Sequence, residues 1–184
     1  MQLNTLGIVH EFLRQTVHPG AFCIDATAGK GRDTALLCRL VGEHGRVLAF
    51  DIQPDAVTQT NDLLAQEGLH AQVILDSHAH MANYAEASTV DAIVFNFGRL
   101  PGGDPHVFTV AESSLSAIDA GLTLLKPGGV MAIALYYGGA NGYEERDAIL
   151  RHLHDLDDRM YSVLTCEWSN RPHDPPMPIF IWKA

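Results

Sequence analysis

Short apolar runs alternate with amphipathic segments along the chain of 184 residues. Apolar runs of four to eight residues predict strands, and apolar positions three and four residues apart predict helices. The predicted strands are Ala21–Asp25, Arg46–Asp51, Ala71–Leu75, Ala92–Phe97, Val130–Tyr136, Tyr161–Glu167 and Ile179–Lys183. The predicted helices are Thr34–Val41, Pro54–Gln66, the weaker Met81–Ala87, Val110–Leu125 and Gly142–Leu156.

This alternation indicates the fold class. Strands that alternate with helices form βαβ units, in which helices cover both faces of a parallel sheet. The last two predicted strands have only the turn-rich segment 170–176 between them, so a strand at that end is expected to run antiparallel. We therefore predict one α/β, Rossmann-like domain over residues 1–184, with a seven-stranded, mostly parallel sheet and one antiparallel strand.

Composition and charge narrow the class of protein. Hydrophobic residues make up 47% and charged residues 18%, which is typical of a folded globular protein. The formal charge of −10 disfavours a generic polyanion binder, because non-specific nucleic-acid affinity comes mostly from Lys and Arg. The three cysteines are scattered, and neither a signal peptide nor a membrane span is recognised in the sequence. We expect a cytoplasmic protein.

The first predicted strand runs into a glycine loop with the sequence DATAGKGRDT, residues 25–34. Its two glycines let the backbone approach a ligand closely, and Asp33 or Thr34 can cap the helix that follows. The spacing is not that of the dinucleotide fingerprint GxGxxG. It is closer to the (D/E)xxxGxG form of S-adenosylmethionine (SAM) enzymes, in which a carboxylate, here Asp25, precedes the glycines. Taken alone, the segment is also compatible with an ordinary strand-to-helix turn.

Polar residues also follow the second and third predicted strands. Asp51 ends the second strand and Gln53 comes soon after it, while Asp76 and His78 follow the third strand. In Rossmann-like sheets an acid about 20 residues beyond the loop accepts hydrogen bonds from ribose hydroxyls. Ligands of such sheets lie beyond the carboxyl ends of the strands. An adenosine-containing cofactor is therefore favoured, and only the loop spacing separates SAM from NAD.

The fourth predicted strand carries Asn96 in its apolar end, before the glycine-rich run GRLPGGD at residues 98–104. An unpaired buried amide costs about 1–3 kcal/mol, so Asn96 is expected to have hydrogen-bond partners. Its amide could hold a nucleophilic amine or the methionine part of the cofactor, and the run 98–104 could shape an acceptor pocket. A satisfied core asparagine before a tight turn is the alternative.

Together these segments resemble one known family. DATAGKGRDT, AFDIQ, LDSHAH, FNFGRLPGGD, and LLKPGGVMAIALYYGG with GYEE are similar to the small class I SAM methyltransferases grouped as rRNA methylases, the MnmM type. Members of that type methylate the 5-aminomethyl group of the wobble uridine of certain tRNAs. The resemblance extends from about His10 to Lys183. The chain departs from the family pattern at Pro105 and Gly139, where the family usually has Lys and His.

The glycine loop and the resemblance together imply roles for individual residues. The expected contacts to SAM are Asp25, Thr27, Gly29, Lys30, Gly31, Asp33, Asp51, Gln53, Asp76, His78 and Asn96. The candidates that would orient an alkylamine acceptor are Asn96, Asp104 and Tyr136. The expected substrate contacts are Arg99, Leu100, Pro101, Gly102, Gly103, Tyr137, Glu144 and Arg171.

Some polar and aromatic residues also have a structural interpretation. The ten histidines include the groups His78–His80 and His152–His154, but nothing lies at a familiar zinc spacing, so no metal is expected. The pair Glu144–Glu145 is expected to form a solvated first turn of a helix, where acidic side chains are favoured. Trp168 and Trp182 are expected to pack in the core or in an interface.

The predicted function is SAM-dependent methylation of 5-aminomethyl- or 5-aminomethyl-2-thiouridine at the tRNA wobble position, with S-adenosylhomocysteine (SAH) as the product. The expected partner is the tRNA anticodon arm, and a homodimer is compatible with the small size of the domain. With a charge of −10, the RNA footprint is expected to be small, around Lys30, Arg32, Arg99 and Arg171. The alternatives are a methyltransferase of rRNA or of a small molecule, a non-catalytic SAM- or nucleotide-binding module, and an NAD-dependent oxidoreductase.

Overall fold

The structure is a computed structural model that describes residues 3–98, 111–138 and 142–184. Its seven-stranded sheet has the order β3-β2-β1-β4-β5-β7-β6, and β7 runs antiparallel to both of its neighbours. The strands are β1 (Phe22–Asp25), β2 (Arg46–Asp51), β3 (Gln72–Leu75), β4 (Val90–Phe97), β5 (Leu125–Leu135), β6 (Tyr161–Thr165) and β7 (Met177–Lys183).

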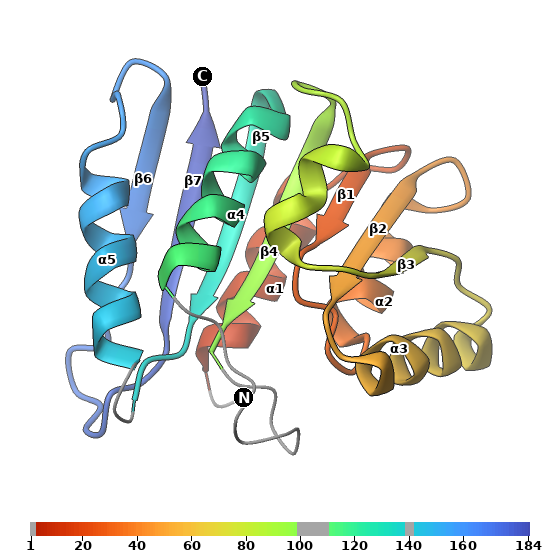
Figure 1. Ribbon diagram of the computed structural model, residues 1–184, viewed down its shortest axis with the longest axis horizontal. Coiled ribbons are helices and arrows are strands. Elements are labelled where there is room, and N and C mark those ends of the chain that lie inside the picture. Colours follow the sequence, from red (N-terminus) through yellow and green to blue (C-terminus); the bar gives the residue numbers. More distant parts are fainter. Residues whose placement is uncertain (1–2, 99–110, 139–141) are drawn as a thin grey trace.

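Helices cover both faces of this sheet (Figure 1). One face carries α1 (Thr5–Thr16), α2 (Arg32–Val41) and α3 (Pro54–Glu67). The other face carries the 3₁₀-helix η1 (His78–Asn83), α4 (Ala111–Leu124) and α5 (Gly142–His154). Helix α4 contacts both η1 and α5, and α2 contacts both α1 and α3. The Rossmann-like fold with a mostly parallel sheet, predicted from the sequence, is confirmed.

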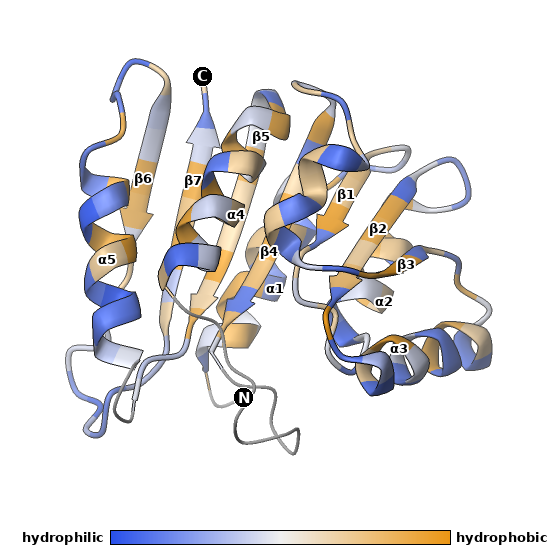
Figure 2. Cartoon of the chain, in the orientation of Figure 1, coloured by the Kyte–Doolittle hydropathy of each residue, from blue (hydrophilic) through white to orange (hydrophobic). Residues whose placement is uncertain are grey.

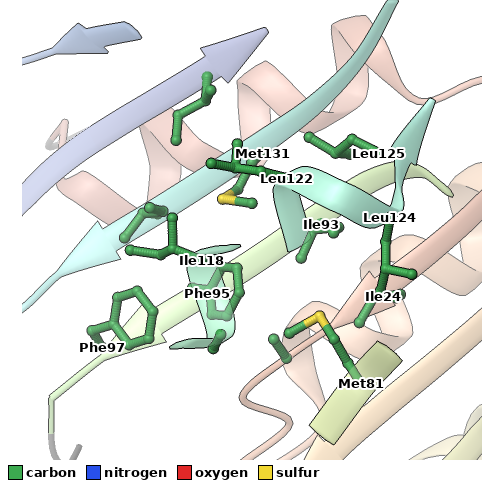
Figure 3. Close-up of a cluster of buried hydrophobic side chains, with 14 of the residues drawn as sticks. Ile24, Met81, Ile93, Phe95, Phe97, Ile118, Leu122, Leu124, Leu125 and Met131 are labelled. Carbon is green, nitrogen blue, oxygen red and sulfur yellow. The ribbon is translucent and has the colours of Figure 1, made fainter. Parts of the chain in front are cut away.

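Successive strand residues enter two different hydrophobic cores, because side chains alternate between the two faces of a sheet. Ile24 and Phe95 belong to the core between the sheet and α4, part of which Figure 3 shows. Cys23 and Val94 belong to the core on the face of α1 and α2. The central strands are mostly apolar along their length (Figure 2). Since both faces are covered, a ligand site has to lie at an edge of the sheet.

The antiparallel strand β7 lies between β5 and β6, with Met177 opposite Leu135 at the carboxyl end of β5. The connection from β6 to β7, residues 166–176, therefore lies at the same edge of the sheet as the carboxyl ends of the parallel strands (Figure 1). The turn-rich composition of segment 170–176 explains why the chain reverses here without a helix.

Several boundaries differ from the prediction. The helix expected at Met81–Ala87 is instead η1, which begins at His78, and the Ser77 hydroxyl caps it by accepting a hydrogen bond from the Ala79 amide at 3.2 Å. Strand β6 ends at Thr165, two residues earlier than predicted, and β7 begins two residues earlier, at Met177. These are local shifts that leave the order of elements unchanged.

Helix α1 is an element that the sequence analysis does not predict. Asn4 caps it by accepting a hydrogen bond from the Gly7 amide at 2.7 Å, and Thr5, Val9 and Leu13 form its buried side. This helix contacts β5, β7 and α2, so it supports the edge of the sheet that the sequence identifies as functional. Within the described ranges, each helix is too short or too polar to cross a bilayer.

Candidate functional site

The polar residues that the sequence singles out gather at one edge of the sheet, the lower edge in Figure 1. Strand β1 lies between β2 and β4, so the strand order reverses direction at β1. Such a switch point opens a crevice beyond the carboxyl ends of the strands, and ligands of doubly wound sheets bind there. The loop after β1 and the ends of β2, β3 and β4 all meet at this crevice.

The glycine loop packs closely on its surroundings. Gly29 and Gly31 both have positive φ angles, +54° and +78°, which favour glycine. The Gly29 amide donates to Asp51 Oδ2 at 2.9 Å, which ties the loop to the end of β2. A Cβ atom at Gly31 would lie 2.9 Å from Thr60 Cα, so no larger residue fits there without a shift of the backbone. The loop is therefore held by a hydrogen bond to the end of β2 and by close packing against α3.

Asp25, the last residue of β1, holds this loop through two hydrogen bonds. Its side chain is fully buried, and it accepts hydrogen bonds from the Thr27 amide at 3.1 Å and the Thr34 hydroxyl at 2.6 Å. Burial raises the pKa of Asp25, and the nearby Asp33 raises it further, while these two hydrogen bonds lower it. Helix α2 begins after Gly31, so the expectation that Asp33 or Thr34 caps it is wrong: Thr34 bonds to Asp25 instead. Direct contact between Asp25 and a cofactor stays a prediction.

The end of β2 offers hydrogen-bond acceptors to a ligand. Asp51 Oδ1 accepts from the Gln53 amide at 2.9 Å, and Oδ2 accepts from Gly29. Each carboxylate oxygen can accept a further hydrogen bond, so Asp51 can still receive hydroxyl donors. Ile52 and Leu75, at the ends of β2 and β3, are each 55% exposed. This combination of hydroxyl acceptors and exposed apolar side chains is suited to binding a nucleoside.

Asp76 follows β3 and is held by three donors. They are the Ser77 amide at 2.7 Å, His80 Nδ1 at 2.8 Å and the Tyr84 hydroxyl at 2.8 Å. The hydrogen bond from His80 lowers the pKa of Asp76, and those from Tyr84 and Ser77 lower it further. His80, one of the histidines considered for a metal, is thus engaged with a carboxylate. No cluster of His, Cys, Asp or Glu that could hold a metal ion occurs in the described part of the chain.

His78 has the buried polar atom that best indicates a missing ligand. Its ring lies edge-on to Phe95 and Phe97, with centroids 6.2 and 5.9 Å apart. Burial lowers the pKa of His78 to about 4, against the effect of a backbone hydrogen bond to Ala26. Its Nε2 atom is buried without a hydrogen-bond partner among the residues that the structure describes. Buried polar atoms normally have partners, so a ligand in the crevice would satisfy this one.

Asn96 is anchored on two sides, as expected. Its backbone amide donates to the Thr27 hydroxyl at 2.7 Å, and its side-chain Nδ2 donates to Asp33 Oδ2 at 2.6 Å. The other oxygen of Asp33, Oδ1, lies 2.5 Å from His10 Nε2. With the nitrogen of the amide turned to Asp33, the Asn96 oxygen faces away from Asp33 and can accept a hydrogen bond. His10 is not among the predicted site residues, because α1 lies before the first predicted element; the cap at Asn4 and the four-residue apolar spacing are the signals for α1.

Tyr136 and Tyr137 directly follow β5, next to β4. The Tyr136 amide donates to the Phe97 carbonyl at 3.0 Å, and its side chain is 38% exposed. Burial raises the pKa of Tyr136, and the charge of Asp33 raises it further, so the phenol is neutral near pH 7. Tyr137 lies under the Arg146 guanidinium, 4.9 Å from the ring centroid. Both tyrosines are therefore at the edge where the prediction places them.

The acidic pair at the start of α5 differs from the prediction. Glu144 is exposed, but Glu145 is buried and its carboxylate accepts a hydrogen bond from the Ser114 hydroxyl at 2.5 Å. The expectation that both form a solvated turn is therefore wrong for Glu145, which joins α5 to α4. Trp182 packs against Phe12 in the core on the face of α1 and α2, as expected, whereas Trp168 is half-buried on the connection from β6 to β7, where it donates to Pro176 O at 3.1 Å.

Of the remaining predicted site residues, Arg171 is half-buried on the connection from β6 to β7, and the others are exposed or not described. Lys30 and Arg32 are exposed beside the glycine loop. One catalytic candidate, five substrate contacts and the two departures from the family pattern lie outside the described residues: Asp104, Arg99, Leu100, Pro101, Gly102, Gly103, Pro105 and Gly139.

Comparisons with known proteins identify the family of this chain. Residues 47–182 match the family described as "Putative rRNA methylase". The chain belongs to this family. It is 32% identical to the chloroplastic tRNA (mnm(5)s(2)U34)-methyltransferase of Arabidopsis thaliana, over 96% of this chain and 68% of that protein.

Two solved structures are similar over the whole of both chains. A protein of Clostridium thermocellum with the same description has a TM-score of 0.97 and 36% identity. A protein of Streptococcus mutans described as "a putative methyltransferase", solved in complex with SAH, has a TM-score of 0.90 and 34% identity. The protein is thus a SAM-dependent methyltransferase, and the resemblance seen in the sequence is confirmed. Its crevice fits that cofactor, with acceptors at Asp51, apolar surface at Ile52 and a His78 nitrogen that has no partner among the described residues.

Proposed function

We propose that this methyltransferase transfers a methyl group from SAM to the amino group of 5-aminomethyluridine, with or without 2-thiolation, at the wobble position of tRNA. The observation that carries the proposal is the orientation of the Asn96 amide, whose oxygen faces away from Asp33 at the carboxyl end of β4. The Arabidopsis relative, named for the modified wobble uridine, supports the substrate class. A homodimer and a small basic contact with the anticodon arm belong to the same proposal.

The cofactor contacts in this proposal follow the crevice from β3 to β4. Asp51 accepts hydrogen bonds from the ribose hydroxyls, and the apolar side chain of Ile52 lies against the base. The cofactor gives His78 Nε2 a hydrogen-bond partner, which the described part of the chain does not supply. Backbone amides and side chains of the glycine loop and its neighbours complete the set: Thr27, Gly29, Lys30, Gly31, Gln53 and Asp76. Bound SAM supplies a methyl group on a positively charged sulfur.

Residues of the protein align the acceptor amine with the methyl group of SAM. An amine attacks only through its lone pair, so the acceptor has to be neutral and correctly oriented. Asn96 Oδ1 accepts an N–H of the acceptor amine, and Asp33 and His10 hold the amide in that orientation. Alignment of this kind contributes up to about 7–11 kcal/mol to a two-partner reaction. Tyr136, being neutral, orients the amine as a hydrogen-bond partner, and water takes the released proton.

The test is methylation of defined RNA with the purified protein. tRNA that carries 5-aminomethyl-2-thiouridine is incubated with SAM, digested to nucleosides and analysed by mass spectrometry. The expected result is conversion to 5-methylaminomethyl-2-thiouridine with one SAH formed per nucleoside. The controls are the same tRNA with an unmodified wobble uridine, which lacks the amine, and ribosomal RNA. Methylation of ribosomal RNA alone, or of neither substrate, would contradict the proposed function.

A further inference from the structure

A cavity of about 330 Å³ lies beside the cofactor crevice and is formed largely by the connection from β6 to β7. Its lining includes Trp168, Arg171, Glu167, Asp174 and Met177. None of the proposed cofactor contacts lines it. Its volume lies within the range of small-ligand sites in proteins, about 300–1,000 Å³.

The cavity lies at the same edge of the sheet as the Asn96 amide. Met177 of β7 is paired with Leu135 of β5, which is paired with Phe97, the residue after Asn96 on β4. Neighbouring strands are about 4.8 Å apart, so two strand spacings place the cavity about 10 Å along the edge from Asn96. Figure 1 shows the connection from β6 to β7 at the edge where β4 and β5 end. A substrate that reaches Asn96 can therefore also reach this cavity.

One wall of the cavity is a stacked pair. The Arg171 guanidinium lies over the Trp168 ring, 3.4 Å from its centroid. The Trp168 indole nitrogen donates to the Thr5 hydroxyl at 3.2 Å and to Pro176 O at 3.1 Å, which fixes the ring. Arg171 also donates to the Leu3 carbonyl. Guanidinium planes and aromatic rings are the surfaces on which proteins stack unpaired RNA bases.

The connection that carries this wall is held in place from several sides. The Thr5 hydroxyl donates to Pro176 O at 2.5 Å, and the Tyr143 hydroxyl donates to Asp174. His173 and Asp174 have positive φ angles of 64° and 49°, which non-glycine residues adopt at a cost and which the surrounding structure has to maintain. The wall is therefore pre-formed, and a ligand does not have to order it.

The charges around the cavity favour a base over a phosphate group. Arg171 is accompanied by two acids, Glu167 and Asp174, in a chain with a formal charge of −10. Carboxylates repel a phosphate, but they accept hydrogen bonds from the N–H groups on the edge of a base. A flat stacking surface with both donors and acceptors at its rim matches a nucleobase.

We propose that this cavity, the flanking-base pocket, binds the base of a nucleotide adjacent to the methylated uridine, stacked on the Arg171–Trp168 pair. The proposal rests on the proposed function, because it requires an RNA substrate. It also explains how an acidic protein holds RNA: the second base supplies contact area that a basic surface would otherwise provide. The pocket thereby positions the acceptor amine at Asn96.

The test compares an intact anticodon stem-loop that carries 5-aminomethyluridine with the same RNA made abasic at the nucleotide 5′ or 3′ of that uridine. Binding is measured by fluorescence anisotropy in the presence of SAH, and methylation by kcat and KM. Loss of a stacked base is expected to raise Kd and KM about tenfold in one of the two abasic RNAs, with kcat changing less. Arg171→Ala is expected to weaken binding of the intact RNA to a similar extent and to remove the abasic penalty.

Two further variants separate the loss of stacking from the loss of a positive charge. Arg171→Lys keeps the charge but lacks the stacking plane, so it is expected to behave like Arg171→Ala. Arg159→Ala removes the same charge from an exposed side chain at the opposite edge of the sheet and is expected to leave RNA binding unchanged. The abasic RNAs test the wild-type protein, so they decide the question even if Arg171→Ala does not fold. Equal Kd and KM for the intact and both abasic RNAs would overturn the pocket alone, whereas failure to bind or methylate intact RNA would overturn the proposed function with it.

Discussion

Asn96 donates its side-chain amide hydrogen to Asp33, with 2.6 Å between Asn96 Nδ2 and Asp33 Oδ2. Because Asp33 is largely buried and its second oxygen contacts His10, the amide is held in one orientation. A polar side chain at the end of a buried strand is thus part of a hydrogen-bonded chain that starts on α1. These hydrogen bonds connect α1 with the proposed acceptor site, and substitutions at Asn96 and at His10 test them separately.

Asn96→Ala removes the group that we propose orients the acceptor amine. We expect kcat to fall by about a hundredfold or more, as when a single aligned hydrogen-bonding group is lost from an active site. Because this change also removes a donor from the buried Asp33 carboxylate, the free energy of unfolding is expected to fall by about 1–3 kcal/mol, while the affinity for SAH, measured by calorimetry, is expected to change little. Asn61→Ala is the matched control, since Asn61 is an exposed amide on α3 that bonds only to the nearby Val57 carbonyl in the described structure. Near-wild-type turnover of Asn96→Ala would remove this residue from the site.

His10→Phe removes the first member of the hydrogen-bonded series His10–Asp33–Asn96. The buried Asp33 carboxylate then loses a donor, and an unsatisfied buried acceptor costs about 1–3 kcal/mol. We expect a lower free energy of unfolding in urea and a fall in kcat of about fivefold to tenfold, because Asn96 is no longer held in one orientation. His10→Gln, whose side-chain amide can donate, is expected to restore much of kcat.

His18 provides the control for this change, because it is exposed on the segment that follows α1. His18→Phe is expected to retain both stability and kcat. If His10→Gln lowers kcat as much as His10→Phe while stability recovers, His10 contributes to folding and not to the orientation of Asn96.

Gly31→Ala tests whether the glycine loop requires close packing as well as a positive φ angle. At Gly31, φ is +78° and an added Cβ would lie 2.9 Å from Thr60 Cα. At Gly68, φ is +64°, but an added Cβ would have no atom within 4 Å. Both alanine variants carry the left-handed penalty of about 1–2 kcal/mol, so the difference between them isolates the contact with Thr60.

We expect Gly31→Ala to lower the free energy of unfolding more than Gly68→Ala does, and to weaken SAH binding measured by calorimetry. Gly68→Ala, at the end of α3, is expected to bind SAH like the wild type. Equal losses of stability in the two variants would show that the loop tolerates a side chain and that only the φ angle matters.

The sequence predicts the parts of this structure that depend on short-range pattern. Alternating strands and helices follow from periodicity, and the residues at the carboxyl ends of β1 to β4 follow from the geometry of parallel sheets. The partners of those residues are harder to predict. Nothing in the spacing indicates that Thr34 bonds to Asp25, that Glu145 is buried against Ser114, or that Tyr84 holds Asp76. The first and third of these contacts join residues nine and eight positions apart and the second joins residues 31 apart, and in each case the packing of the elements decides the partner.

The β6–β7 connection illustrates the same limit. Its Asn, Pro and Asp residues predict a turn. The stacking of Arg171 on Trp168 depends on α1, which supplies Thr5 and Leu3 as hydrogen-bond partners. Since the sequence analysis assigns no element before residue 21, it places Arg171 among the substrate contacts without the cavity that gives Arg171 its surroundings.

His78→Gln tests the buried imidazole through the dependence of stability on pH. In the folded protein, burial lowers the pKa of His78 to about 4, whereas the unfolded chain titrates near the ordinary value of 6.5. Between these values the unfolded state binds more protons, so the stability that the neutral imidazole contributes is complete above pH 6.5 and is lost as the pH falls toward 4. The loss amounts to at most about 1.4 kcal/mol per pH unit.

The measurement is the free energy of unfolding in urea from pH 7.5 to pH 4.5 for the wild type, His78→Gln and His154→Gln. The wild type is expected to lose more stability than His78→Gln over this range, because glutamine does not titrate. His154 is exposed at the end of α5, so His154→Gln is expected to follow the wild-type curve. If the wild-type and His78→Gln curves run parallel, His78 does not titrate differently in the folded and unfolded states, and its side chain is open to water in the crevice.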